Sequence, residues 1–186
     1  PPDLPETTPR VTAAARWSAA VEEVVDACDG FLRRAAIAAS LTPDERREIL
    51  RGMALTRATD NRLKAFFTGG EVRYGEAAFQ GKGFRSLGQE AIYAAAIRFR
   101  RGPGFHDAGI WHGDVIAPLI RDLGAVLAMS PHETMVRYVL SAQMAKAGPP
   151  MNGKDIHVGD FGWGVLPPAA PLGIGALTIA GMAMAF

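Results

Sequence analysis

The chain has 186 residues, of which 48% are hydrophobic, and its 20 basic and 19 acidic residues give a formal net charge of +1. This length suits one domain or slightly more, with enough apolar residues for a core. The charges are mixed without a basic stripe, which argues against a nucleic-acid partner. The single cysteine excludes an internal disulfide framework, and residues 1–9 lack a secretory-signal pattern, so we expect a cytoplasmic protein.

Residues 1–40 are expected to form an N-terminal arm followed by a helix. The first ten residues contain four prolines, which favour a loose arm. Residues 10–40 have the Ala, Val and Glu content of a helix, with an interruption predicted near Asp29 and Gly30. A domain over residues 41–186 is predicted to follow.

Several helices are predicted in this domain. Residues 42–45 (Thr-Pro-Asp-Glu) form a capping box with proline at the first helical position, and the glycines at 69–70 are expected to end that helix. A second capping box at residues 130–133 predicts a helix that continues through Met144 to Gly148 and Pro149. Residues 87–100 and 115–129 also have helical patterns. We therefore expect the first 150 residues to be mainly helical.

No charged residue follows Asp160, which raises the alternative of a membrane anchor. Prolines divide this stretch, and the fifteen residues after Pro171 would span about 22 Å as a helix, less than the roughly 30 Å hydrocarbon core. Their Gly and Ala content favours a helix packed closely against a sheet or a second subunit. We therefore expect no membrane span.

Four polar side chains close together in the sequence could form a metal site: His106, Asp107, His112 and Asp114. Imidazole and carboxylate groups are ligands for zinc or iron, so a metal-dependent hydrolase is one alternative. The six-residue spacing of the histidines places them on different sides of a helix, and Gly109 suggests a loop. The interpretation we favour is a polar loop whose Asp114 caps the following helix.

Residues 75–83 are glycine-rich and superficially resemble a phosphate-binding loop. A Walker loop has four residues between its glycines and then Lys followed by Ser or Thr. Here five residues separate Gly75 from Gly81, and Gly83 follows Lys82. We therefore expect a mobile loop and no nucleotide site.

Four segments carry a resemblance to a known family. They are Phe-Arg-Ser-Leu-Gly-Gln-Glu-Ala at 84–91, Ile-Arg-Asp-Leu-Gly at 120–124, Asn-Gly-Lys-Asp-Ile-His-Val at 152–158 and Ala-Ala-Pro-Leu-Gly at 169–173. In this order and spacing they resemble the alpha subunit of the thiamine diphosphate-dependent, decarboxylating first component of the 2-oxo acid dehydrogenase complexes. The resemblance covers approximately residues 50–186. It implies an α/β chain with the thiamine diphosphate-binding fold, here mostly its helical N-terminal part and the start of a parallel-sheet layer.

The resemblance also implies roles for individual residues. Arg121 would bind the cofactor diphosphate, for which a planar guanidinium is well suited, and Ile120 occupies the place of a tyrosine in the family. Ala170 and Leu172 would hold the aminopyrimidine end of the cofactor. His157 is the catalytic candidate, because an imidazole can donate or accept a proton near neutral pH. The alternative for Arg121 is a helix-surface arginine that pairs with Asp122 or Glu133, and the alternative for His157 is a hydrogen-bonded loop histidine.

The implied activity is oxidative decarboxylation of a 2-oxo acid, with the cofactor as electron sink and acyl transfer to a lipoyl group on an acyltransferase. A beta subunit would complete the active site of the heterotetramer, so this chain alone is expected to be inactive. The family's Gly-Asp-Gly motif and Asn, which hold magnesium, are expected beyond Phe186. The remaining alternative is a non-catalytic or split-subunit interaction module of the same fold.

Overall fold

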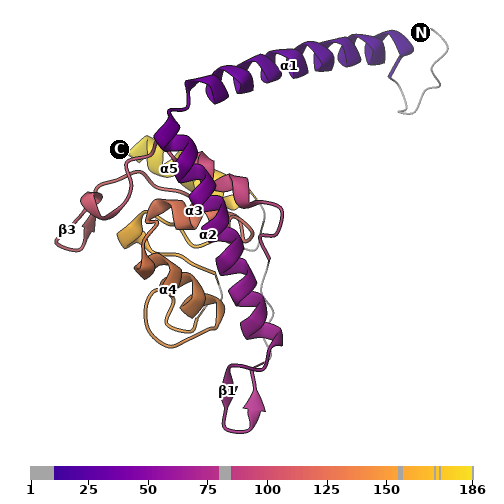
Figure 1. Ribbon diagram of the computed structural model, residues 1–186. Helices are drawn as coiled ribbons and strands as arrows, with labels where there is room; N and C mark the ends of the chain where they lie inside the picture. Colours follow the sequence, from indigo (N-terminus) through magenta and orange to yellow (C-terminus); the bar gives the residue numbers. More distant parts are fainter. Residues whose placement is uncertain (1–10, 80–84, 155–156, 170, 172, 186) are drawn as a thin grey trace. The chain divides into compact units, whose positions relative to one another are not determined.

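The computed structural model describes residues 11–79, 85–154, 157–169, 171 and 173–185 (Figure 1). The chain divides into two compact units, Pro1–Pro43 and Asp44–Phe186. The described residues form a mixed α/β structure that is mainly helical, with only two-stranded sheets. None of the described helices combines the length and apolar character needed to cross a bilayer.

The described part of the first unit contains the helix α1 (Ala13–Ser40), which is continuous. The interruption predicted near Asp29 and Gly30 is therefore wrong. A single glycine inside a helix costs only about 1 kcal/mol relative to alanine, and the surrounding residues are good helix formers. The N-terminus is capped by Thr12, whose Oγ1 accepts a hydrogen bond from the Ala15 amide at 3.2 Å.

Helices build most of the second unit. The described α-helices are α2 (Pro43–Thr68, whose first residue belongs to the first unit), α3 (Leu123–Met129), α4 (Glu133–Gln143) and α5 (Ile174–Ala185). Short 3₁₀ helices are η1 (Glu90–Ala96), η2 (Pro103–Phe105) and η3 (Phe161–Trp163). The predicted start and end of α2 are confirmed, since the local signals at Pro43 and Gly69 determine both.

Two antiparallel hairpins contribute the strands: β1 (Arg73–Tyr74) with β2 (Ala77–Ala78), and β3 (His106–Asp107) with β4 (Ile110–Trp111). The first hairpin lies partly in the segment predicted to be a loop, and residues 80–84 are outside the described residues. A single parallel bridge joins Ile116 to Val165. The Ile116 amide donates to the Gly164 carbonyl at 2.8 Å, and the Ile116 carbonyl accepts from Leu166 at 2.9 Å.

Three other helix predictions need correction. Residues 115–118 are not helical but extended, because Ile116 pairs with the distant residue Val165, and α3 begins only at Leu123. Of residues 87–100, only η1 forms a helix, and it is of the 3₁₀ type. The N-cap of α4 is His132, whose Nδ1 accepts from the Thr134 amide at 3.3 Å, since the predicted capping residue already ends α3. The helix ends at Gln143, earlier than predicted.

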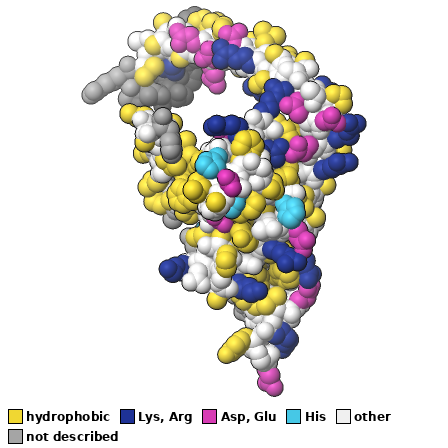
Figure 2. All heavy atoms as spheres, turned by 90° about the vertical axis from the view of Figure 1, so that its left-hand side faces the viewer, with side chains coloured by type: hydrophobic (Ala, Val, Ile, Leu, Met, Phe, Trp, Pro, Cys, Tyr) yellow, Lys and Arg dark blue, Asp and Glu magenta, His cyan; other side chains and the backbone are white. Residues whose placement is uncertain are grey.

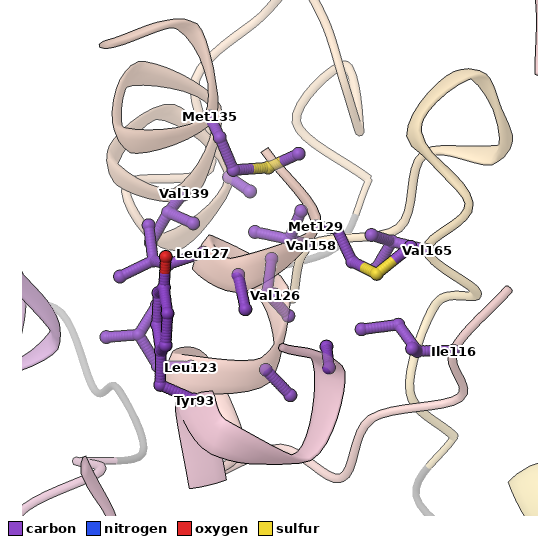
Figure 3. Close-up of a cluster of buried hydrophobic side chains, with 14 of the residues drawn as sticks. Tyr93, Ile116, Leu123, Val126, Leu127, Met129, Met135, Val139, Val158 and Val165 are labelled. Atoms are coloured by element: carbon purple, nitrogen blue, oxygen red, sulfur yellow. The ribbon is translucent and has the colours of Figure 1, made fainter. Parts of the chain in front are cut away.

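The core of the second unit surrounds α3, all seven residues of which are buried. A helix that is apolar on all faces must be covered on all faces. The side chains around it in Figure 3 come from η1, α4 and the segments joined by the parallel bridge: Tyr93, Met135, Val139, Ile116, Val158 and Val165. This packing brings together segments that are far apart in the sequence.

α2 packs closely against η1 at Gly52. A Cβ atom at Gly52 would lie 2.4 Å from ring carbons of Tyr93, whose side chain is fully buried. Real Cβ atoms do not approach other atoms so closely, so the ring or the helix would have to move. The glycine is therefore needed for space and not for an unusual backbone conformation.

We expect Gly52→Ala to lower the free energy of unfolding by about 2 kcal/mol, although alanine favours a helix, because the packed ring must shift. Gly181→Ala in α5 is the matched control, since a Cβ atom there meets nothing within 4 Å. That substitution should be neutral or stabilise by up to about 1 kcal/mol. Urea unfolding of both variants measures the difference, and equal effects would contradict the close contact at Gly52.

Candidate functional site

A small cavity in the second unit lies where the sequence segments of the resemblance meet. Its volume of about 20 Å³ leaves room for roughly one water molecule. Ser86, Ile120 and Val158 line it, and each belongs to a different one of these segments. Pro168, which directly precedes the fourth segment, completes the wall. Three segments that are separated in the sequence therefore converge on one cavity, and the residue before the fourth segment lies beside them.

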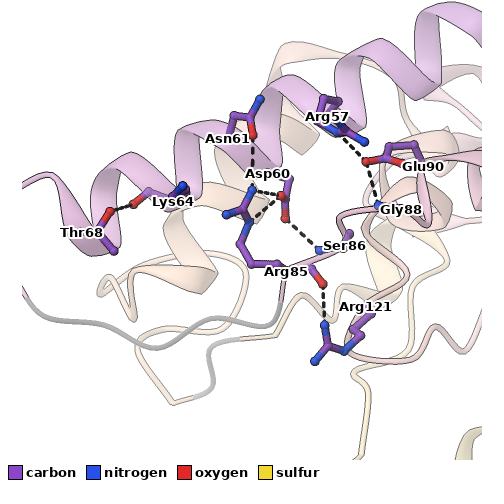
Figure 4. Close-up of polar contacts among 10 residues, drawn as sticks. All are labelled: Arg57, Asp60, Asn61, Lys64, Thr68, Arg85, Ser86, Gly88, Glu90 and Arg121. Carbon is purple, nitrogen blue, oxygen red and sulfur yellow. Dashed lines mark hydrogen bonds and ion pairs between the residues drawn. The ribbon is translucent and has the colours of Figure 1, made fainter.

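Arg121 is exposed, and its neighbour Ile120 is half-buried against the cavity. The Nη1 atom of Arg121 donates a hydrogen bond to the Arg85 carbonyl at 2.9 Å (Figure 4). Of the two carboxylates named as alternative partners, Glu133 forms an ion pair with Arg137 at 2.5 Å, and Asp122 accepts a hydrogen bond from the Leu119 amide at 2.9 Å. The contact with Arg85 links the second segment of the resemblance to the first.

Asp60 of α2 fixes the segment that holds Arg121. Its carboxylate is 1% exposed and accepts hydrogen bonds from the Ser86 amide at 2.8 Å and from Arg85 Nε at 2.5 Å. Arg85 also donates to the Asn61 side chain at 3.3 Å. Figure 4 shows this path from Asp60 through Arg85 to Arg121. Sequence reasoning missed Asp60, although a carboxylate within a helix that must bury one face is a signal for an internal partner.

The start of η1 is fixed in a similar way. Glu90 Oε1 accepts from Arg57 Nε at 2.6 Å and from the Gly88 amide at 3.2 Å. The hydrogen bond from Arg57 is the main reason that the pKa of Glu90 falls to about 2. Because this pKa is lower in the folded chain, the resulting stability is present above the ordinary glutamate pKa and is lost as the pH falls towards 2. α2 therefore holds both ends of the first segment.

His157 is half-buried and directly precedes Val158, which lines the cavity. The loop before it is folded tightly: the Asn152 amide donates to the Gly148 carbonyl at 2.7 Å, and the Asn152 side chain accepts from the Gly148 amide at 3.0 Å. The imidazole is thus attached one residue away from the cavity wall. Ala170 and Leu172, the predicted aminopyrimidine contacts, lie outside the described residues.

Asp160 is a second titratable group in this loop that sequence reasoning did not single out. Its Oδ1 accepts from the Gly162 amide at 2.9 Å. Burial raises the pKa of Asp160, and the Gly162 hydrogen bond and the nearby His106 partly oppose that rise. Its position three residues after His157 is the signal that could have identified it.

The proposed metal ligands lie on or beside the β3–β4 hairpin: His106, Asp107, His112 and Asp114. The ring of His106 stacks on Trp163 with centroids 5.2 Å apart. Asp114 forms an ion pair with Arg100 at 2.7 Å, and the prediction that it caps the next helix is wrong, because α3 begins only at Leu123 with Asp122 at the N-cap position. Among the residues that the structure describes, no group of three or more His, Cys, Asp or Glu side chains is arranged to hold a metal ion.

Comparison with known protein families, characterised proteins and solved structures finds no match for this chain. On the face seen in Figure 2, basic and acidic side chains are interspersed and no basic field stands out. The chemistry of the site therefore rests on its own residues: the exposed guanidinium of Arg121, the half-buried imidazole of His157, and a small cavity lined by their neighbours Ile120 and Val158.

Proposed function

We propose that the chain is the N-terminal part of a cytoplasmic alpha subunit of a thiamine diphosphate-dependent 2-oxo acid dehydrogenase, with the thiamine diphosphate-binding fold. The convergence of three segments of the resemblance on one cavity, with Pro168 just before the fourth segment in its wall, supports this proposal most strongly. The parallel bridge between Ile116 and Val165 agrees with the start of a parallel-sheet layer. The proposed partners are a beta subunit and a lipoyl-bearing acyltransferase.

The chemistry of the donor set fits the diphosphate end of the cofactor. Arg121 presents an exposed, permanently charged group to phosphate oxygens, and its hydrogen bond to the Arg85 carbonyl limits how far it can turn. The cavity is much too small for the cofactor, so the cofactor would lie against the surface that this chain shares with the beta subunit. Magnesium ligands are proposed to lie beyond Phe186.

The remaining roles follow from position. Ile120, with Ala170 and Leu172, would supply contacts to the cofactor ring. His157 would hold or transfer a proton beside the reacting carbon. When bound, thiamine diphosphate supplies the electron sink for decarboxylation. The protein's own contribution is to orient the cofactor and to place the imidazole.

Replacing Arg121 tests this assignment. We expect Arg121→Ala to weaken thiamine diphosphate binding by about 30-fold, because a charge-assisted hydrogen bond to phosphate is lost, and Arg121→Lys to have an intermediate effect. Calorimetric titration of the cofactor with magnesium into the complete alpha–beta assembly measures the affinity. Arg137→Ala on α4 is the control, since that arginine forms an exposed ion pair. Unchanged affinity in the Arg121→Ala assembly would remove Arg121 from the site.

A non-catalytic interaction module of the same fold is the second candidate. The apolar helix α5 favours it, because none of its described residues is buried and Leu177 and Met184 are 75% and 89% exposed. The helix itself was predicted, with packing against a sheet or a second subunit; none of its described residues is buried against a sheet, which leaves the second subunit as the prediction. A module of this kind would assemble with its partner and yet bind no thiamine diphosphate.

A further inference from the structure

The first unit exposes an apolar helix face. None of the described residues of α1 is buried, and its large hydrophobic side chains are 46–64% exposed: Trp17, Val21, Val24, Val25, Phe31, Leu32 and Ile37. A shallow apolar groove lined by Val24, Ala27, Cys28, Phe31 and Leu32 runs along this face. In proteins most of the stability of a helix comes from the packing of its apolar face, so a partner is expected to cover this face.

The spacing of these residues is that of a helix-pairing seam. Alternating steps of four and three residues connect seven positions over three heptads: Trp17, Val21, Val24, Cys28, Phe31, Ala35 and Ala38. At 100° per residue, Val25 and Leu32 flank this seam, whereas Ile37 lies on the opposite side of the helix. The charged side chains lie outside the seam. The partner that covers this apolar face should therefore be another helix.

The charges of α1 argue against a lipid surface as the cover. The helix has four acidic residues and three arginines, and helices that lie on anionic membranes carry an excess of Lys or Arg.

The order of the charges along α1 indicates the orientation of a paired helix, since an acidic stretch at 22–29 precedes Arg33 and Arg34. Two parallel copies would place acidic stretches side by side. Two antiparallel copies place the acidic stretch of one beside the arginines of the other.

We propose that α1 pairs antiparallel with α1 of a second copy of this chain. In the register that sets Cys28 opposite Phe31, Val24 faces Ala35 and Val21 faces Ala38, so each larger side chain meets a smaller one. The same patch on both copies is then self-complementary, as a two-fold interface requires. The six large residues on or beside the seam expose roughly 600 Å² per helix, which approaches the ~800 Å² per partner of a standard interface.

Phe31→Ala tests the pairing without opposing helix formation, since alanine is the best helix former. Sedimentation velocity of the full chain should show a dimer for the unsubstituted protein. Each dimer of the variant loses two rings, so its dissociation constant should rise roughly 100-fold or more. Ile37→Ala is the matched control: it removes a residue of similar exposure from the opposite face and should change the constant less than about threefold.

Cys28 allows an independent test of the helix pairing by cross-linking, because it is the chain's single cysteine. A bismaleimide cross-linker of about 10 Å span should join two copies through Cys28, since paired helix axes lie 8–10 Å apart. The product should be lost in Phe31→Ala and retained in Ile37→Ala. A monomeric unsubstituted chain, a dimer unaffected by Phe31→Ala, equal weakening by both substitutions, or a monomer that binds anionic vesicles through α1 would each overturn the proposal.

Discussion

Asp60→Ala is expected to lower the free energy of unfolding by about 4 kcal/mol. The carboxylate is 1% exposed and bonds to both the Arg85 side chain and the Ser86 amide. Its removal leaves a buried amide without its acceptor and a mostly buried guanidinium, 27% exposed, without its counter-charge. Losing one partner of a buried ion pair costs about 3–5 kcal/mol. Since Arg85 carries the carbonyl that orients Arg121, cofactor affinity should fall as well.

Urea unfolding measures this effect, and Asp44→Ala provides the comparison on the same helix. Asp44 forms an ion pair with Arg47 in which the two side chains are 88% and 64% exposed. Exposed pairs contribute little, so Asp44→Ala should change stability by less than about 1 kcal/mol. Asp60→Asn should fall between the two variants, because it keeps one acceptor oxygen and removes the charge. A loss of less than about 1 kcal/mol in Asp60→Ala would show that Asp60 does not anchor the Arg85 segment.

His157→Gln is expected to lower turnover of the complete alpha–beta assembly by about 10²–10⁴-fold, the usual contribution of a positioned acid or base. Glutamine keeps hydrogen-bonding capacity but cannot exchange a proton near neutral pH. Thiamine diphosphate affinity should change less than about threefold, because the proposed role of His157 is in chemistry and not in binding. Decarboxylation rates and calorimetric titration together separate the two effects.

His112→Gln is the control for this experiment. His112 is exposed and belongs to the alternative group of metal ligands, so under the proposed function its replacement should leave the rate unchanged. Equal loss of activity in both variants would argue for a general effect on folding. Loss only in His112→Gln, with activity that depends on added zinc, would instead favour the metal-dependent hydrolase.

Capping residues, prolines and glycines in the sequence correctly predict those helix ends that depend only on neighbouring residues. Pro43 and Gly69 define the ends of α2 because proline suits the first helical turn and glycine ends a helix. Residues 115–118 were predicted to be helical, but their backbone groups pair with residues 164–166, far along the chain. No sequence pattern within residues 115–118 or 164–166 indicates that the two segments pair. The prediction that α1 is interrupted was wrong for the opposite reason. The weak local signal at Asp29 and Gly30 is outweighed by the good helix formers on both sides.

The candidate site shows the same division. Arg121, Ile120 and His157 could be selected from the order of the sequence segments, whereas for Asp60 the sequence indicates at most a buried partner and not which residue that partner is. The partner of Asp60, Arg85, lies 25 residues away, and nothing near either residue indicates their contact. The convergence on one cavity is likewise a property of packing around α3. The sequence therefore predicts candidate ligands, and the fold identifies the residues that position them.

The most direct test of the proposed function is release of carbon dioxide from a panel of 2-oxo acids by the complete alpha subunit assembled with its beta subunit. The proposal predicts release that requires both thiamine diphosphate and magnesium and that is lost in the His157→Gln assembly. A folded assembly that neither binds thiamine diphosphate nor releases carbon dioxide from any 2-oxo acid would contradict it.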